Sequence, residues 1–210
     1  MIWIRITKSG GESMNDFLKS SNLKQDVLIV TPCIHNGQYL LFKQKYEKTG
    51  KAFSIIRNPY DKALSAYKWL VKNPQGNRRC KDVFDPNISF TDFTKKTYIL
   101  RSKFDQVRNV CVTLDHGEFG TKHYQEYWVV SHLESCFDSI NFFIDPSKVE
   151  LISLEKMQEF SKTLITGDKK FPHKNVSSSD KILSATERSL VENIYEKDFE
   201  LYERAKEWKS

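Results

Sequence analysis

The stretch Ile2-Trp-Ile-Arg-Ile6, followed at once by Thr7-Lys-Ser-Gly-Gly-Glu-Ser-Met14, decides the fold of this chain. Its first part has the character of a short apolar strand, and its second part is a loop with a glycine pair that leads into a helix. Glycines let the backbone turn sharply and approach a ligand, while the N-terminus of the following helix carries roughly half a positive charge. The pattern therefore predicts a cradle for a phosphate-type anion.

Polar side chains in this loop supply a counter-charge and hydrogen-bond donors. Lys8 provides the charge, and Ser9 and Ser13 provide hydroxyl groups. In a Walker A loop the lysine follows the last glycine and precedes a serine or threonine that binds magnesium. Here the lysine precedes both Gly10 and Gly11, so we expect a phosphate-type ligand rather than a metal-bound triphosphate.

A second segment makes the ligand more specific. Residues 52–56 form an apolar run, residues 57–61 form a turn, and residues 62–70 have helical character. Arg57 therefore lies at the carboxyl end of a predicted strand, where open α/β sheets bind their ligands. Ser65 follows about two helical turns later, and we expect an anion to be held between these two side chains.

Together the two segments resemble the cytosolic and Golgi-type sulfotransferases that use 3′-phosphoadenosine 5′-phosphosulfate (PAPS). In that family a loop close to Pro-Lys-(Thr/Ser)-Gly-(Gly/Thr)-Thr-Ser binds the 5′-phosphosulfate, and a second motif, Arg-(Asp/Asn)-Pro-(Tyr/Phe), followed by Arg/Lys, Ser and Tyr/Phe, binds the 3′-phosphate. The matching residues are Lys8, Ser9, Gly10, Gly11 and Ser13 in the first motif, and Arg57, Asn58, Pro59, Tyr60, Lys62, Ser65 and Tyr67 in the second. The chain departs from the pattern at Thr7, which replaces proline, and at Glu12, which replaces a hydroxyl residue.

The resemblance implies a set of residues that bind the donor PAPS and its product, 3′-phosphoadenosine 5′-phosphate (PAP). These are Lys8, Ser9, Gly10, Gly11, Glu12, Ser13, Met14, Arg57, Ser65 and Lys170. A carboxylate facing the phosphate would repel it, so we expect Glu12 to point outward as an acidic residue of the first helical turn. Lys170 belongs to a late basic loop that resembles the one closing over the donor, with Phe171 packing near the adenine.

Later segments resemble the carbohydrate-modifying branch of the family, namely residues 149–155, 172–177 and 194–202. The resemblance implies transfer to a hydroxyl group of an acceptor, expected to be a carbohydrate. We assign His123, Tyr124 and Trp128 to acceptor binding, because aromatic rings stack on sugars. The spacing of Tyr124, Tyr127 and Trp128 also fits the buried stripe of an amphipathic helix.

Two residues are expected to carry the chemistry. Lys8 is suited to neutralise the charge that develops on the leaving phosphate. His35 follows the second predicted strand and lies between the two phosphate motifs, and the ordinary pKa of histidine suits a general base. Competing candidates for the base are His123, His132, Glu118 and Glu126.

Two other functions fit parts of this pattern. A P-loop phosphoryl-transfer enzyme would need a Walker lysine and a carboxylate for magnesium, and the sequence offers no convincing pair. A non-catalytic relative that binds an adenine nucleotide or a polyanion would bind the donor without turnover.

Composition agrees with one compact enzyme domain over residues 1–210, since 39% of the residues are hydrophobic. The net charge of +6 indicates an anionic partner, but without a dense basic block we expect no nucleic-acid target. We expect a soluble, cytoplasmic protein, because no membrane-spanning run and no signal-peptide pattern is present. Its four cysteines show neither a CxxC pair nor the clustering of a metal site, so we expect free thiols and no metal.

The order of elements predicts an α/β fold of the three-layer, P-loop-like kind, in which helices flank a central parallel sheet. The predicted strands are 2–6, 27–31, 52–56, 109–113 and 149–153. The predicted helices are 11–20, 60–72, 89–99, 124–137, 154–164 and 185–206.

Overall fold

The computed structural model describes residues 1–31, 36–102, 125, 129–130, 132–165, 170–172 and 182–209. The chain divides into two compact units, and each is described by itself below. Unit 1 comprises residues 1–58, 135–177 and 197–210, and unit 2 comprises residues 59–134 and 178–196. The expectation of a single domain over 1–210 stays a prediction.

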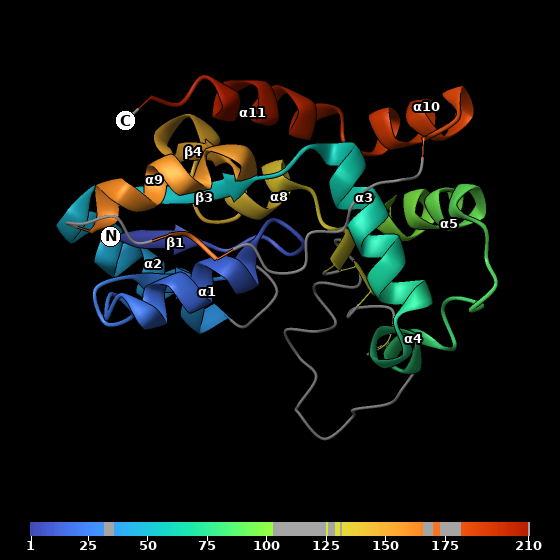
Figure 1. Ribbon diagram of the computed structural model, residues 1–210, viewed down its shortest axis with the longest axis horizontal. Helices are drawn as coiled ribbons and strands as arrows, with labels where there is room; N and C mark the ends of the chain where they lie inside the picture. Colours follow the sequence, from blue (N-terminus) through green and yellow to red (C-terminus); the bar gives the residue numbers. More distant parts are fainter. Residues whose placement is uncertain are drawn as a thin grey trace. The chain divides into compact units, whose positions relative to one another are not determined.

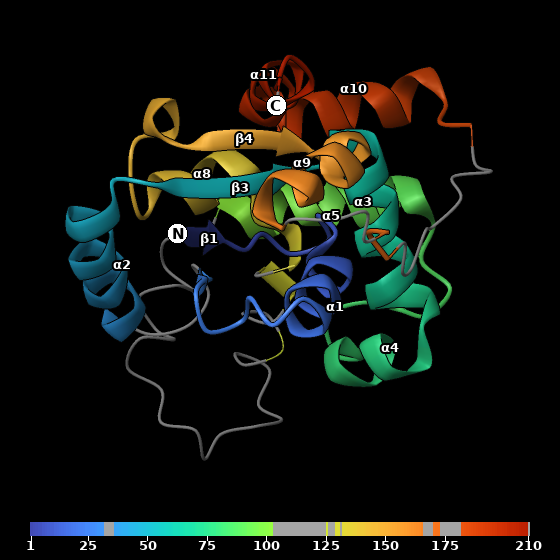
Figure 2. The same cartoon turned by 60° about the vertical axis from the view of Figure 1, so that its left-hand side comes forward.

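A parallel sheet forms the centre of unit 1 (Figure 1). Its strands are β1 (Ile2–Ile4), β2 (Leu28–Val30), β3 (Ala52–Ile56) and β4 (Glu150–Ser153). The order across the sheet is β2-β1-β3-β4, and Figure 2 shows β1, β3 and β4 side by side. In the register, Ile2 lies opposite both Leu28 and Ala52. All neighbouring strands pair in parallel, which confirms the predicted sheet type.

Helices cover both faces of this sheet. Successive residues of a strand point to opposite faces, and accordingly Ile2 and Ile4 pack in one buried cluster while Trp3 packs in the other. The first cluster is completed by residues of α2 (Asn36–Thr49), α8 (Cys136–Asn141) and α11 (Glu196–Lys206). The second is completed by residues of α1 (Gly11–Ser20) and α9 (Met157–Leu164). Strands buried on both faces explain the continuous apolar runs in the sequence, and the three-layer prediction is confirmed for this unit.

A buried carboxylate holds the start of α8. Asp198 on α11 has no exposed surface, and its two oxygens accept from the backbone N–H groups of Cys136 at 2.8 Å and Phe137 at 3.0 Å. Ser135 also caps α8, by accepting from the N–H of Asp138 at 2.9 Å. These bonds satisfy N–H groups that a helix leaves unpaired at its beginning.

Unit 2 is helical in the residues described. It contains α3 (Pro59–Tyr67), the π-helical turn η1 (Lys68–Lys72), α4 (Pro74–Cys80), α5 (Phe90–Ser102) and α10 (Ala185–Ile194). Helix α3 contacts both α5 and α10. A capping box stabilises the start of α10, because Ser184 accepts from the N–H of Glu187 while the Glu187 carboxylate accepts from the N–H of Ser184.

Several element predictions need correction. Helices α2 and α4 were not predicted, and α4 lies in the stretch between the predicted helices 60–72 and 89–99. The expected final helix over 185–206 is two helices that break at Tyr195. The predicted strand 109–113 lies outside the described residues, and so do residues 124, 126–128 and 131 of the predicted helix 124–137. Within the described part of the chain, no helix is both long and apolar enough to cross a bilayer.

Candidate functional site

The predicted anion cradle lies between β1 and α1, at the carboxyl end of the sheet. Two residues of the loop take a left-handed backbone conformation, Lys8 with φ of 62° and Gly10 with φ of 78°. Such a φ is uncommon for a residue with a side chain and often marks a functional site. Helix α1 then begins at Gly11, and no side chain in the described chain caps it by hydrogen bonding. The loop thus presents the positive end of α1 toward the space that a bound anion would fill.

The loop packs closely against its neighbours at both glycines. A Cβ atom added to Gly10 would lie 2.5 Å from Cδ1 of Leu154, the residue directly after β4. A Cβ on Gly11 would lie 2.8 Å from Nε of Arg5. The loop is therefore held against the ends of both β1 and β4.

The serine hydroxyls of the loop are buried. Ser9 is 1% exposed and Ser13 is 4% exposed. The Oγ atom of Ser9 makes no hydrogen bond to any described residue. A buried hydroxyl without a partner costs free energy, and a bound anion at the cradle would supply the missing acceptor.

Two cations meet at this loop. The guanidinium of Arg57, directly after β3, donates from Nη1 to the backbone carbonyl of Lys8 at 3.3 Å. Burial lowers the pKa of Lys8 from 10.5 to about 8, and the nearby charge of Arg57 acts in the same direction while Glu12 opposes it. A bound anion would offset both effects and restore the charge on Lys8.

Replacing Gly10 with alanine is expected to cost more stability than the same change at Gly50, which also has positive φ but open space around it. The left-handed backbone alone costs roughly 1–2 kcal/mol, so we expect about 1 kcal/mol for Gly50→Ala. For Gly10→Ala we expect about 2–3 kcal/mol, because Leu154 must also move, together with weaker anion binding. Urea denaturation and sulfate titration of both variants measure these effects. Equal losses for the two would contradict the close contact at Gly10.

The other predicted donor-site residues fall in different places. The side chain of Glu12 is exposed, as expected, whereas Met14 is fully buried in the core and its N–H donates to the carbonyl of Gly10 at 3.1 Å. Met14 therefore packs the helix rather than facing a ligand. Ser65 belongs to α3 of unit 2, so its partnership with Arg57 stays a prediction.

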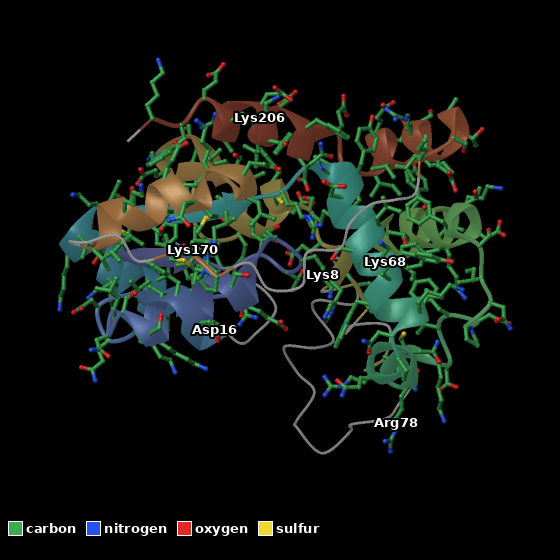
Figure 3. The ribbon with its side chains drawn as sticks, in the orientation of Figure 1. Lys8, Asp16, Lys68, Arg78, Lys170 and Lys206 are labelled. Carbon is green, nitrogen blue, oxygen red and sulfur yellow. The ribbon has the colours of Figure 1, made fainter. Side chains whose placement is uncertain are left out.

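The late basic loop is described only at residues 170–172. Phe171 is 1% exposed, its ring lies 5.6 Å from that of Phe17 on α1, and its N–H donates to the Gln158 side chain on α9 at 2.9 Å. The expected contact with adenine is therefore replaced by packing in the core. Lys170 is exposed, and Figure 3 shows it apart from Lys8.

Most of the residues expected to form the base and the acceptor site lie outside the described part of the chain. His35, His123, Tyr124 and Trp128 lie outside the described residues, and so do Tyr127, Glu118 and Glu126. His132, the remaining competitor for the base, is partly buried in unit 2. The assignments of the base and the acceptor site stay predictions.

Two buried polar groups near the motifs were not assigned from the sequence. Ser153, which ends β4 opposite Ile56, is 1% exposed, and its hydroxyl finds no partner among the described residues. Lys62 on α3 has no exposed surface. For Ser153 the available signal was its place inside an apolar run, whereas Lys62 has a charged neighbour, Asp61, and gave no such signal.

Comparison with known protein families assigns the chain to one of them. The sulfotransferase family matches residues 1–203. The chain therefore belongs to the sulfotransferase family, whose members transfer a sulfuryl group. No curated protein and no solved structure matches it. In the part of the chain that the structure describes, no group of three or more His, Cys, Asp or Glu side chains is placed to hold a metal ion.

Proposed function

We propose that this protein transfers the sulfuryl group of PAPS to a hydroxyl group of an acceptor, and that the acceptor is a carbohydrate. The observation that carries the proposal is the cradle at the start of α1, where the helix N-terminus, Lys8 and the buried Ser9 hydroxyl, which has no partner among the described residues, lie in one loop. Each is suited to an anion, and together they fit the phosphosulfate end of the donor.

The reaction requires that one bond forms as another breaks. The acceptor oxygen bonds to sulfur while the bond from sulfur to the bridging oxygen of the 5′-phosphate breaks, and PAP leaves. Negative charge appears on the leaving phosphate, where the ammonium of Lys8 stabilises it. A base takes the acceptor proton, and we assign this role to His35 from its position in the sequence.

The remaining roles follow the sequence motifs. Arg57 and Ser65 bind the 3′-phosphate, and Lys170 adds positive charge toward the donor. His123, Tyr124 and Trp128 bind the carbohydrate. The structure supports Arg57 most directly, because its contact with the Lys8 carbonyl brings a second cation to the cradle.

Isothermal titration calorimetry with PAP and AMP tests the donor assignment. We expect PAP to bind more tightly, and Arg57→Ala to remove most of that preference, because a charge-assisted contact with the 3′-phosphate contributes roughly 1.5–3 kcal/mol. Arg78→Ala, at an exposed arginine of α4, is the matched control and should keep the preference. An unchanged preference in Arg57→Ala would show that another residue reads the 3′-phosphate.

A further inference from the structure

One buried charge lies inside the predicted 3′-phosphate motif and has no role in the chemistry above. Lys62 is 0% exposed, in the middle of α3. Lysine is almost never fully buried unless its charge is paired or hydrogen-bonded. With no exposed surface, its ammonium is not available to a ligand from solution, so its function must be sought in the groups that surround it.

The Lys62 ammonium binds two groups from distant parts of unit 2. Its Nζ atom donates to the backbone carbonyl of Glu134, and it lies over the ring of Tyr195, 5.1 Å from the ring centroid. A cation over an aromatic ring is attracted by the electron-rich face, and more strongly when water is excluded. Lys62 therefore joins α3 to two segments that are far away in the sequence.

Tyr195 is itself fixed in place. It is 2% exposed, and its hydroxyl donates to the carbonyl of Leu133 at 3.0 Å. The guanidinium of Arg101 lies 5.2 Å from the same ring and donates to the carbonyl of Ile194. The contacts of Lys62 are thus made to a rigid, buried group rather than to a mobile side chain.

The three segments joined by Lys62 lie at three of the four points where the chain enters or leaves unit 2. Helix α3 begins at the first residue of the unit, Glu134 is the last residue before the chain returns to unit 1, and Tyr195 lies one residue before the final return. The Lys62 ammonium therefore contacts two of these boundary segments from α3, near the residue where that helix begins. Ser65 lies three positions further along the same helix, a spacing that places the two residues on adjacent turns.

We propose that Lys62 is a positioning residue, which holds α3 against Glu134 and Tyr195 so that Ser65 is set to bind the 3′-phosphate of the donor. This inference rests on the proposed function, because it assumes that Ser65 takes that phosphate. It separates the roles within one motif, in which Arg57 and Ser65 bind the phosphate and Lys62 fixes the helix that carries Ser65.

The test compares the ratio of the dissociation constants for AMP and PAP in the parent and in Lys62→Met. Methionine keeps the length of the side chain and removes its charge. We expect the ratio to fall by roughly tenfold, the effect of one hydrogen bond to a charged group, while AMP affinity stays near that of the parent. Lys62→Arg should recover part of the ratio, because it restores a cation. Lys95→Met, at a lysine of α5 whose side chain is 60% exposed, should leave the ratio unchanged.

A second variant separates positioning from a loss of stability. Phe84→Leu leaves a cavity at a fully buried site of unit 2, where the ring packs against Phe93 of α5, and should lower the melting temperature but keep the ratio. If Phe84→Leu lowers the ratio as much as Lys62→Met, then Lys62 is only structural and the inference fails. The inference also fails if folded Lys62→Met keeps the parent ratio.

If Lys62→Met does not fold, hydrogen exchange of the parent protein tests the positioning role of Lys62 instead. PAP, but not AMP, should then protect the amides of residues 59–67, because the phosphate acts on that helix. It should also protect the amides of residues 190–195, because Lys62 joins that helix to Tyr195. Protection confined to the cradle would overturn the inference. A parent protein that binds PAP no better than AMP would instead refute the proposed function, so the two failures are distinguishable.

Discussion

Replacing Lys8 with methionine is expected to lower kcat by roughly 10²–10³-fold, the loss that follows removal of one group stabilising transition-state charge. The affinity for PAP should change much less, because the helix N-terminus and Arg57 still attract the phosphates. The charge that Lys8 is proposed to stabilise appears only as the bond to sulfur breaks, so its contribution belongs to the transition state rather than to the ground state. Single-turnover kinetics at saturating PAPS separates the two effects. A variant with parent turnover and weak donor binding would make Lys8 a binding residue only.

The lowered pKa of Lys8 gives this assignment a pH signature. The free protein carries a charged Lys8 only below a pH of about 8, and kcat/KM reports the ionisation of free enzyme. We therefore expect kcat/KM to fall as the pH rises through about 8, and Lys8→Arg to move that fall to higher pH. The folded pKa lies below the usual value, so the unfolded chain binds more protons above pH 8. The contribution of Lys8 to stability should consequently rise with pH over the interval from about 8 to 10.5.

Replacing His35 with alanine is expected to lower turnover by roughly 10²–10⁴-fold, the usual contribution of a positioned base, while PAP affinity stays near that of the parent. We expect His35 to be the base because it follows the second strand in the sequence and lies between the two phosphate motifs. An ascending limb near the ordinary pKa of histidine should disappear in this variant. A carboxylate base would place that limb at lower pH unless it were strongly desolvated.

The control for His35 is a set of variants at the other residues considered for the general base. Single-turnover sulfation by His35→Ala and His35→Gln is measured beside Glu118→Gln, Glu126→Gln, His123→Ala and His132→Ala. Parent rates in both His35 variants, with an inactive protein among the others, would transfer the role of base to that residue and leave the sulfotransferase assignment intact.

The cradle could be predicted from the sequence because all of its parts are local. A strand, a glycine pair and a helix start within a few residues of each other, and the boundaries predicted for α1 and β3 agree with the structure. Arg57 could be placed for a related reason, since parallel strands end at the same edge of a sheet. The left-handed φ of Lys8 could not be foreseen, because it is unusual for any residue other than glycine.

Other features depend on contacts between distant segments. Phe171 follows a lysine pair and looks like part of an exposed loop, yet the neighbouring Phe17 and Gln158 draw it into the core. Helix α2 has no clear apolar stripe in its sequence, and its packing rests on a few side chains such as Phe42. The buried Lys62 reads as a charged residue on the surface of a helix until Glu134 and Tyr195 are placed around it.

Transfer of labelled sulfate tests the central claim most directly. The parent protein is incubated with ³⁵S-labelled PAPS and separate pools of glycans, lipids and small alcohols, with Lys8→Met as the control for enzyme-independent transfer. We expect label to appear on a glycan, together with an equal amount of PAP, and much more slowly with the variant. Tight binding of PAPS with no label on any acceptor would contradict catalysis and identify a nucleotide-binding relative, and label confined to a lipid or alcohol would contradict the carbohydrate assignment.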